Sequence, residues 1–396
     1  MRNLSSYINK RIHTQFHKEP VILDLSHGLF SSNTVDSGSL LLLKSLPDNI
    51  HYGTTRAILD AGSGTGVLGI ALGKKCPGSE VTFQDRDALG TEFSRHNAEL
   101  NRLDNFRIRH SLLLEKAEPK EFDCILSNFP AKAGRPVLEQ FLTEAPYYLT
   151  EGGVCAVVVV SPLAEFTRNI LEATGMEITY ENSIKSHSVY HFRGKVEDKK
   201  IPEPDIPHSY IRAQEKFHIK DIRYRLETVY GLPEFDTLSR HTKLAGELLR
   251  RKPPSGRILF WNPGQGHLPA AASLLGQKLL EPVLSGRDCL SLQISRKNLL
   301  KHECLPEVIP GTAALEDLQD HGLKYDGITA LPDPVPNVKW EKPFMHGAAR
   351  LLYPGGILVI GGRSVDISRL LTAASGFSLD YSVKDKGYRA VSMKLL

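Results

Sequence analysis

The strongest constraint on the fold is a glycine-rich turn that joins two apolar segments. Residues 58–72 read ILDAGSGTGVLGIAL, which predicts a strand, a turn and then a helix. Glycine tolerates the positive φ angles of a tight turn and leaves the backbone open to a ligand. The amides at the start of the helix can hold polar or anionic groups. We therefore predict a nucleotide-type cofactor loop at the carboxyl end of a strand, where open α/β sheets bind ligands.

The rest of the first half alternates apolar strands with amphipathic helices. Strands are predicted at 21–25, 80–84, 106–110, 122–127 and 154–160, and helices at 39–46, 67–74, 136–149 and a segment ending at Asn101. Residues 1–20 predict an exposed arm or a first helix. Continuous apolar strands separated by helices are typical of a parallel sheet covered on both faces.

The same pattern returns in the second half of the chain. Three segments match earlier ones in order and spacing: 258–268 matches 58–68, 325–328 matches 122–125, and 352–356 matches 149–153. The chain is therefore predicted to be an internal duplication. The fold class that follows is α/β, with two tandem Rossmann-like domains, each a mostly parallel, doubly wound sheet.

The two copies differ at their polar positions. Phe260 replaces Asp60, Asn262 replaces Gly62, Leu331 replaces Asn128, Ser239 replaces Asp36, His241 replaces Gly38, and Asp85 falls opposite Ile294 or Ser295. The second copy keeps the residues that shape the fold and lacks those that would hold a cofactor. We predict one working site, in the first copy, and a degenerate second copy.

The length of 396 residues suits two domains. Prolines among charged residues after position 195 favour an extended linker. We predict a catalytic domain over 1–195, a linker over 196–225 and a degenerate domain over 226–396. The longest apolar run, 154–160, is far too short to span a membrane, and 1–18 lacks an apolar signal core. A cytoplasmic protein that works as a monomer, without membrane attachment, is expected.

Cysteine usage and charge narrow the class further. The five cysteines form no CxxC pair and mostly adjoin apolar runs, which indicates reduced thiols. Residues 1–195 carry 21 Lys+Arg against 22 Asp+Glu, whereas residues 196–396 carry 28 against 23. The second half therefore either has ordinary variation in surface charge or carries a surface for a polyanion such as RNA.

Two carboxylates accompany the glycine turn. Asp60 extends the turn to the pattern DxGxGxG, and Asp85 is the first acid after the next predicted strand. A carboxylate there can accept two hydrogen bonds from ribose hydroxyls, in adenosine as well as in NAD. Residues 64–69 also match the dinucleotide pattern GxGxxG, but nothing after the turn resembles a hydride-transfer site.

Residues 127–134 read SNFPAKAG and follow a predicted core strand. With the glycine turn and Asp85, the run Asn128-Phe129-Pro130 resembles the class I S-adenosylmethionine (SAM) methyltransferases, and most closely their Asn-Pro-Pro-aromatic subgroup, which modifies planar NH₂ groups. The resemblance implies SAM as cofactor and no metal. It also implies that the Asn128 side-chain carbonyl accepts a hydrogen bond from the target amine, and that Phe129 and Pro130 shape the pocket.

The resemblance also implies a set of cofactor residues. These are Asp60, Gly62, Ser63, Gly64, Gly66, Asp85, Arg86 and Ser111. The glycines would admit the methionine end, Asp85 would hold the ribose, and Ser111 would lie near the adenine. Arg86 either touches the cofactor or forms a charge pair at the start of a helix.

A narrower resemblance covers nearly the whole chain. Residues 27–31, 35–39, 128–134 and 188–190 are similar to segments of RsmC/RlmG-type rRNA guanine-N2 methyltransferases, which are also tandem duplications with one degenerate copy. In that family the N-terminal copy is usually the degenerate one, whereas here the first copy is intact. Phe129 also replaces the first Pro of the motif, and Ala131 stands where an aromatic residue would stack on the base.

The sequence thus predicts a SAM-dependent N-methyltransferase that acts on an exocyclic amine, with guanine N2 of rRNA as the favoured acceptor and RNA as partner. Two alternatives stay open. The acceptor could be a protein amide or a small molecule, which the missing aromatic at Ala131 favours. The chain could also be a non-catalytic RNA-binding or assembly factor built from methyltransferase-like domains.

Overall fold

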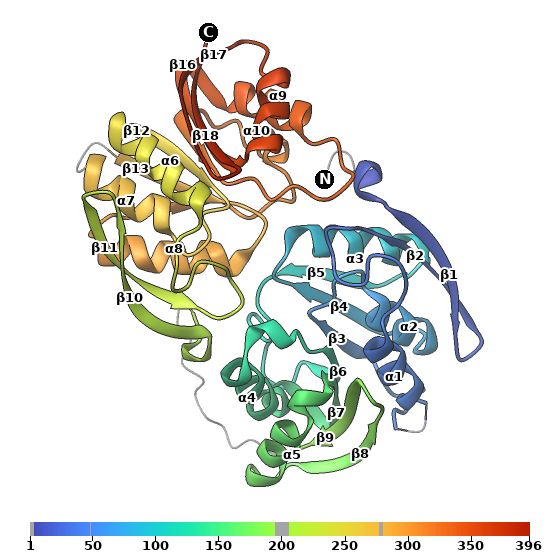
Figure 1. Cartoon of the computed structure of the whole chain (residues 1–396). Helices are drawn as coiled ribbons and strands as arrows, with labels where there is room; N and C mark the ends of the chain where they lie inside the picture. The colour runs from blue at the N-terminus through green and yellow to red at the C-terminus, as the bar shows by residue number, and fades with distance from the viewer. Residues whose placement is uncertain (1–3, 48, 195–205, 277–279) are drawn as a thin grey trace. The chain divides into compact units, whose positions relative to one another are not determined.

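The computed structural model describes residues 4–47, 49–194, 206–276 and 280–396. The chain divides into two compact units, one within residues 3–203 and one within residues 204–396, which we call the first and second domains. Each domain consists of a β-hairpin followed by a seven-stranded sheet with helices packed on it (Figure 1).

The first domain begins with the hairpin β1–β2 and continues as a doubly wound sheet. Its elements are β1 Lys10–Phe16, β2 Glu19–Leu25, α1 Ser37–Ser45, β3 Ala57–Ala61, α2 Val67–Lys75, β4 Glu80–Asp85, α3 Ala88–Leu100, β5 Phe106–His110, β6 Phe122–Asn128, α4 Arg135–Glu144, β7 Leu149–Val160, α5 Ala164–Ala173, β8 Glu177–Ser183 and β9 His187–Arg193. The strand order is β5-β4-β3-β6-β7-β9-β8, in which the first five strands are parallel and β9 runs antiparallel to both neighbours.

The second domain repeats this arrangement. Its elements are β10 Ile211–Ile219, β11 Ile222–Val229, α6 Arg240–Arg251, β12 Gly256–Trp261, α7 His267–Gly276, β13 Leu280–Ser285, α8 Cys289–Lys301, β14 Glu307–Val308, β15 Tyr325–Ala330, α9 Glu341–Leu351, β16 Leu352–Arg363, α10 Ser364–Ala373, β17 Phe377–Asp385 and β18 Tyr388–Leu395. The strand order β14-β13-β12-β15-β16-β18-β17 is that of the first sheet, element for element. The predicted α/β class with two tandem Rossmann-like domains is confirmed.

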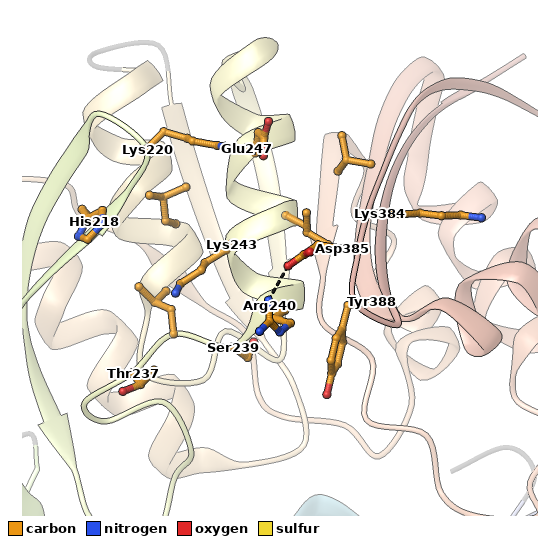
Figure 2. A pocket seen from close by; sticks show the side chains of 14 residues that line it. His218, Lys220, Thr237, Ser239, Arg240, Lys243, Glu247, Lys384, Asp385 and Tyr388 are labelled. Atoms are coloured by element: carbon orange, nitrogen blue, oxygen red, sulfur yellow. Dashed lines mark hydrogen bonds and ion pairs between the residues drawn. The ribbon is translucent and has the colours of Figure 1, made fainter.

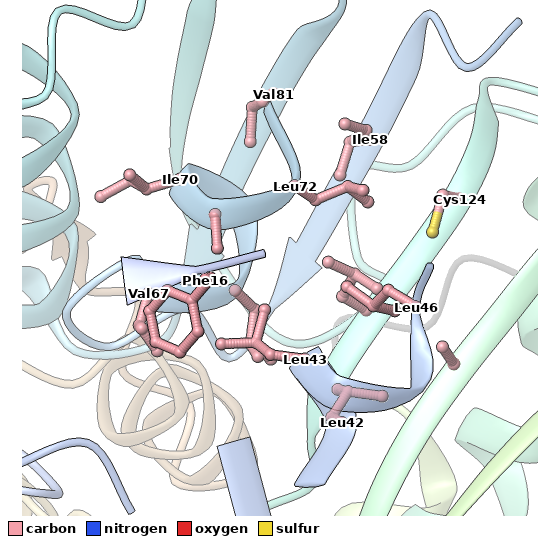
Figure 3. Close-up of a cluster of buried hydrophobic side chains, with 14 of the residues drawn as sticks. Phe16, Leu42, Leu43, Leu46, Ile58, Val67, Ile70, Leu72, Val81 and Cys124 are labelled. Carbon is pink, nitrogen blue, oxygen red and sulfur yellow. The ribbon is translucent and has the colours of Figure 1, made fainter. Parts of the chain in front are cut away.

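Alternate side chains of the central strands supply the core on the two faces of each sheet. In β12, Ile258 and Phe260 pack with α6, α7 and α8, whereas Leu259 and Trp261 pack with α9 and α10. In the first domain, Ile58 of β3 joins residues of α1 and α2 and of the β1–β2 hairpin in one buried cluster (Figure 3). Successive side chains of a strand point to opposite faces of the sheet, and both faces are apolar here, as a parallel sheet covered by helices on both faces requires.

Two expectations about the chain differ from the structure. Residues 10–16 form a strand rather than an arm or a helix, because His17 and Lys18 both adopt positive φ angles and close a tight hairpin turn. The predicted linker over 196–225 is also too long at its end, because residues 211–225 belong to the β10–β11 hairpin of the second domain. Residues 195–205 lie outside the described residues.

The five cysteines are all unpaired, and four of them are buried, as expected for reduced core thiols. Among the described residues, no helix is long and apolar enough to cross a membrane. The same residues contain no cluster of histidine, cysteine and acidic side chains that could hold a metal ion.

Candidate functional site

The glycine turn lies between β3 and α2, at the carboxyl edge of the first sheet. Gly64 has a φ of +54°, and a Cβ atom built on it would meet no other atom within 4 Å. Gly66 has a φ of +79°, and its Cβ would lie 3.3 Å from the Cα of Ser94 on α3. Gly66 is therefore needed for packing, whereas Gly64 leaves an open stretch of backbone that a ligand can approach.

Asp85 ends β4 next to this turn. Its two carboxylate oxygens accept hydrogen bonds from the backbone N–H groups of Gly64 and Asp87, each at 2.8 Å. Burial raises the pKa of Asp85 to about 6. Each carboxylate oxygen can accept more than one hydrogen bond, so Asp85 is fixed in place and still able to receive two hydroxyl groups.

The buried side chains of Asp60 and Ser63 support the glycine turn from the interior of the protein. The Asp60 carboxylate is 1% exposed and accepts a hydrogen bond from the Gly69 N–H of α2 at 2.8 Å. Burial, together with the nearby Asp85 charge, raises the pKa of Asp60 to about 7. The Ser63 hydroxyl lies 2.9 Å from that of Ser94. Both side chains point into the protein, so they hold the strand, turn and helix in register.

Arg86 directly follows β4, and Ser111 directly follows the neighbouring strand β5. The backbone carbonyl of Arg86 lies 2.8 Å from Nε2 of His110. Ser111 is 1% exposed, and its hydroxyl donates to the carbonyl of Glu115 at 3.2 Å. Its N–H donates to the carbonyl of Asp85 at 3.0 Å. Ser111 thus ties its own loop to the end of β4, which is a supporting position.

Asn128 ends β6, and its side-chain amide is held by the start of α1. Its Nδ2 group donates to both carboxylate oxygens of Asp36, at 3.0 and 3.2 Å, and to the Ser39 hydroxyl at 3.0 Å. An ionised carboxylate can only accept hydrogen bonds, so the nitrogen of the amide must face Asp36. The partners of the nitrogen therefore fix the orientation of the amide.

The other end of the Asn128 amide is available for binding. Its Oδ1 atom has no hydrogen-bond donor among the described residues of the chain. The side chain is partly exposed at the edge of the sheet where the glycine turn also lies. The structure therefore presents a fixed acceptor oxygen at this edge, which suits recognition of an N–H donor.

The two residues after Asn128 have different surroundings. Phe129 is 3% exposed and packs against Phe141 of α4, with ring centroids 5.9 Å apart. Pro130 is exposed, and its carbonyl accepts a hydrogen bond from the Ala133 N–H at 2.8 Å. Phe129 therefore anchors the loop in the core, and Pro130 with Ala131 forms its exposed part.

Asp36 is a site residue that the sequence reasoning did not include. Besides Asn128, it accepts hydrogen bonds from the N–H groups of Gly38 and Ser39, at 2.9 and 3.1 Å, and so caps α1. The signal was present, because the degenerate copy loses Asp36 and Asn128 together, to Ser239 and Leu331. Joint loss of two distant polar residues indicates that they act as a unit.

The second copy differs from the first beside its glycine turn, although the backbone at Gly264, with a φ of +60°, is as open as that at Gly64. Asn262 stands where the first copy has Gly62, with a φ of +54°, and its Oδ1 accepts a hydrogen bond from the Arg287 N–H at 3.0 Å. A Cβ atom on Gly286 would lie only 2.5 Å from this Oδ1. The side chain of Asn262 thus fills the space beside the turn.

Strand register corrects one predicted equivalence between the copies. Trp261 pairs with Ser285 as Ala61 pairs with Gln84, so the position of Asp85 falls on Gly286 and not on Ile294 or Ser295. The conclusion for the site is unchanged, since glycine cannot accept hydrogen bonds from hydroxyl groups through a side chain.

The hydrogen bonds that support the fold are kept in both copies. The side-chain amide of Asn97 in α3 accepts a hydrogen bond from the Asp24 N–H and donates to the Asp24 carbonyl. It also donates to the carbonyl of Thr65 at 2.9 Å. Asn298 of α8 bonds in the same way to Glu227 and Gln265. The second copy has therefore lost ligand-facing groups selectively, while its architecture is retained.

Comparisons with known proteins agree with this architecture. Residues 21–186 match the family model described as methyltransferase small domain. The "Ribosomal RNA small subunit methyltransferase C" of Hamiltonella defensa is 36% identical over 135 residues, which cover 33% of this chain and 38% of that protein. The "Uncharacterized protein YbxB" of Bacillus subtilis is 31% identical over 133 residues, which cover 33% of this chain and 65% of that protein.

The match to these relatives is partial, whereas the match in fold extends over both domains. The chain spans about two-fifths of the length of the first curated relatives. The solved structure of the 16S rRNA N2 methyltransferase RsmC of Thermus thermophilus, in complex with AdoMet and guanosine, has a TM-score of 0.68 at 16% identity and covers 99% of both chains. At this identity the likeness shows a shared two-domain fold.

Proposed function

We propose that the chain transfers a methyl group from SAM to guanine N2 of ribosomal RNA, because residues 21–186 match the methyltransferase small domain and align with ribosomal RNA methyltransferases. The observation that carries the proposal is the fixed Asn128 amide, whose Oδ1 atom is free to accept a hydrogen bond from an amine. Similar proteins named as ribosomal RNA methyltransferases support the choice of acceptor.

The open backbone at the glycine turn fits SAM. Gly64 has free space where a side chain would stand, and Asp85 lies beside it with its carboxylate held by two N–H groups. We propose that Asp85 accepts hydrogen bonds from the ribose hydroxyls and that Gly62, Gly64 and Gly66 border the methionine end. The glycine turn and the loop after β5 are held in place by three buried side chains, those of Asp60, Ser63 and Ser111, and Arg86 lies at the rim of the site.

The chemistry assigned to Asn128 is positioning. SAM supplies an electrophilic methyl group on a positively charged sulfur, which keeps the bonding electron pair when the methyl group is transferred. Oδ1 of Asn128 accepts a hydrogen bond from the acceptor NH₂ group and directs the nitrogen lone pair toward that methyl group. The proton released from the methylated nitrogen passes to solvent. Correct orientation of two reactants can lower a barrier by up to about 7–11 kcal/mol, so no metal or covalent nucleophile is needed.

Asp36 is proposed as a positioning residue for this step. It holds the nitrogen of the amide and thereby keeps Oδ1 turned toward the acceptor. Ser39 adds a bond to the same nitrogen. Phe129 fixes the loop by packing on Phe141, and Pro130 lies in the exposed part of the loop next to the acceptor.

The direct test is transfer of a labelled methyl group from SAM to separated RNA, protein and metabolite fractions. The proposal expects label in ribosomal RNA, as N2-methylguanosine after digestion, and none with Asn128→Ala. A protein amide is the second candidate, because Ala131 offers no aromatic ring to stack on a base and is exposed with Lys132. Label confined to the protein fraction would favour that second candidate.

We place the reaction in the cytoplasm.

A further inference from the structure

A cavity of about 920 Å³ lies in the second domain on the exposed side of α6 (Figure 2). Its walls come from three places: the end of β10, the α6 helix with its N-cap residue, and the turn between β17 and β18. The volume falls within the range of roughly 300–1,000 Å³ that is typical of ligand pockets. The cavity is therefore large enough for a nucleotide-sized group, and one domain forms it alone.

Cationic side chains dominate this cavity. Lys220, Arg240, Lys243 and Lys384 line it, against the two carboxylates of Glu247 and Asp385. Lys220 lies 3.4 Å from Glu247, and Arg240 lies 2.6 Å from Asp385. These ion pairs are partly exposed to solvent. Exposed ion pairs contribute only about 0–1 kcal/mol, so a phosphate group can replace a carboxylate as partner.

Two of the four cations, Lys243 and Lys384, have no side-chain partner among the described residues. Lys243 is exposed on the first turn of α6, and its side-chain ammonium forms no hydrogen bond or ion pair with any residue of the described chain. Figure 2 shows its side chain extending from α6 toward the β10–β11 hairpin, which carries His218 and Lys220, whereas Lys384 points away on the other side. Lys243 thus presents an unneutralised charge to the part of the cavity between helix and hairpin.

An aromatic ring adds a second kind of contact. Tyr388, at the start of β18, lines the cavity and stacks on His241 with ring centroids 5.8 Å apart and an interplanar angle of 27°. Aromatic side chains beside cationic ones are the combination that binds single-stranded nucleic acid, because bases stack and phosphates pair with the cations.

The first domain lacks this surface at the equivalent place. Asp36 caps α1 as Ser239 caps α6, so Arg240 falls on Ser37 and Lys243 falls on Leu40. In the first domain that region is closed, because His187 approaches Gly38 so tightly that a Cβ atom there would lie 2.8 Å from its ring, and its Nδ1 lies 3.3 Å from the Ser37 hydroxyl. The second copy therefore has positive charge and a cavity beside the helix start at which the first copy has Asp36 and its bond to Asn128.

We propose that this cavity binds the phosphate backbone of a single-stranded segment of the RNA substrate, with Lys243 as its principal phosphate contact and Tyr388 as a stacking surface. The inference rests on the proposed function for the identity of the RNA, and it assigns the degenerate copy a substrate-docking role. None of residues 262–266 lines the cavity, so this role does not use the glycine turn of the second copy.

The test measures binding of a short fluorescent single-stranded RNA to the full chain at several salt concentrations, without SAM. Lys243→Gln removes the charge, and Lys243→Glu reverses it. Lys342→Glu is the matched control, because Lys342 is an exposed lysine on α9 of the same domain and does not line the cavity. Loss of one phosphate contact lowers the slope of log affinity against log salt by roughly 0.7 for a single strand.

The proposal expects a lower salt slope and weaker binding for Lys243→Gln, a larger loss for Lys243→Glu, and a wild-type slope for Lys342→Glu. Equal behaviour of Lys243→Glu and Lys342→Glu would overturn it. Methyl transfer is measured separately with the wild-type chain on ribosomal RNA, so a failure of the proposed function shows there and leaves the binding comparison readable. Unfolding midpoints equal to wild type confirm that the variants fold, as expected for exposed lysines without partners.

Discussion

The Asp36→Ser variant separates two roles that one carboxylate performs in the first domain. Asp36 caps α1 through the N–H groups of Gly38 and Ser39, and it also holds the Asn128 amide. Serine is an equally good cap, and the second domain demonstrates this, because Ser239 caps α6. A serine at position 36 therefore keeps the helix start and removes the carboxylate that orients Asn128.

The magnitude follows from the bonds that are lost. Nδ2 of Asn128 lies 3.0 and 3.2 Å from the two oxygens of Asp36, which is a hydrogen bond to a charged acceptor worth about 1.5–3 kcal/mol. If this energy holds Asn128 in the orientation for transfer, its loss lowers kcat by roughly 10-fold to 150-fold, since each 1.36 kcal/mol is a factor of ten. Ser39 still binds the same nitrogen, which favours the lower end.

The assay compares kcat, the Kd for SAM and the free energy of unfolding for Asp36→Ser and Asp36→Ala. Both variants should lose turnover and keep the affinity for SAM, because the partners of Asp36 are α1 and Asn128 and not the glycine turn. Only Asp36→Ala should also lose about 1 kcal/mol of stability, through the missing cap. A wild-type kcat for Asp36→Ser would refute the positioning argument.

Three further predictions concern the same domain. Asn128→Ala should keep the Kd for SAM and lose most of kcat, and isothermal titration together with steady-state kinetics would reveal any loss of SAM affinity that contradicts this. The Asp85 carboxylate must be ionised to accept hydrogen bonds from two hydroxyl groups, and its pKa is about 6, so the affinity for SAM should fall roughly tenfold per pH unit below that value. The Asp85→Asn variant should bind SAM weakly at every pH. If its affinity for SAM showed the wild-type pH dependence, a group other than Asp85 would be responsible. Gly69→Ala should lower the free energy of unfolding in urea by about 1–3 kcal/mol, because the new Cβ would lie 2.6 Å from Phe83 and 2.9 Å from Val81 of β4. An unchanged urea midpoint would contradict this and show that β4 can shift to make room for the methyl group.

The fold could be predicted to a large extent from local patterns. The strand, glycine turn and helix over 57–75 and the buried strand over 122–128 occur where apolar runs and turn residues predict them. The duplication was visible because turns and apolar runs recur in the same order. The β10–β11 hairpin was missed because prolines up to Pro207, just before it, indicated a linker and because charged residues occupy its outward positions. The alternation of Ile222, Tyr224 and Leu226 in β11 was a strand signal that the reasoning did not use.

The candidate site was predictable in its residue types and less so in its geometry. The sequence places Asp85 and Asn128 at strand ends, which parallel topology brings to one edge. It could not show that Asp60 bonds to Gly69 inside the protein, because a carboxylate before a glycine turn can face either way. Nor could it show the bond between Asp36 and Asn128, since the two are far apart in the chain and pair only through the docking of α1 on the sheet.

The central claim is that the first domain methylates guanine N2 of ribosomal RNA with Asn128 as the amine-orienting residue. The most direct measurement incubates the full chain with labelled SAM and unmodified ribosomal RNA, digests the RNA and separates the nucleosides, with Asn128→Ala in parallel. The account predicts label in N2-methylguanosine for the wild-type chain and a loss of nearly all of it for the variant. Label in a different nucleoside, in protein alone, or at equal levels in both chains would contradict it.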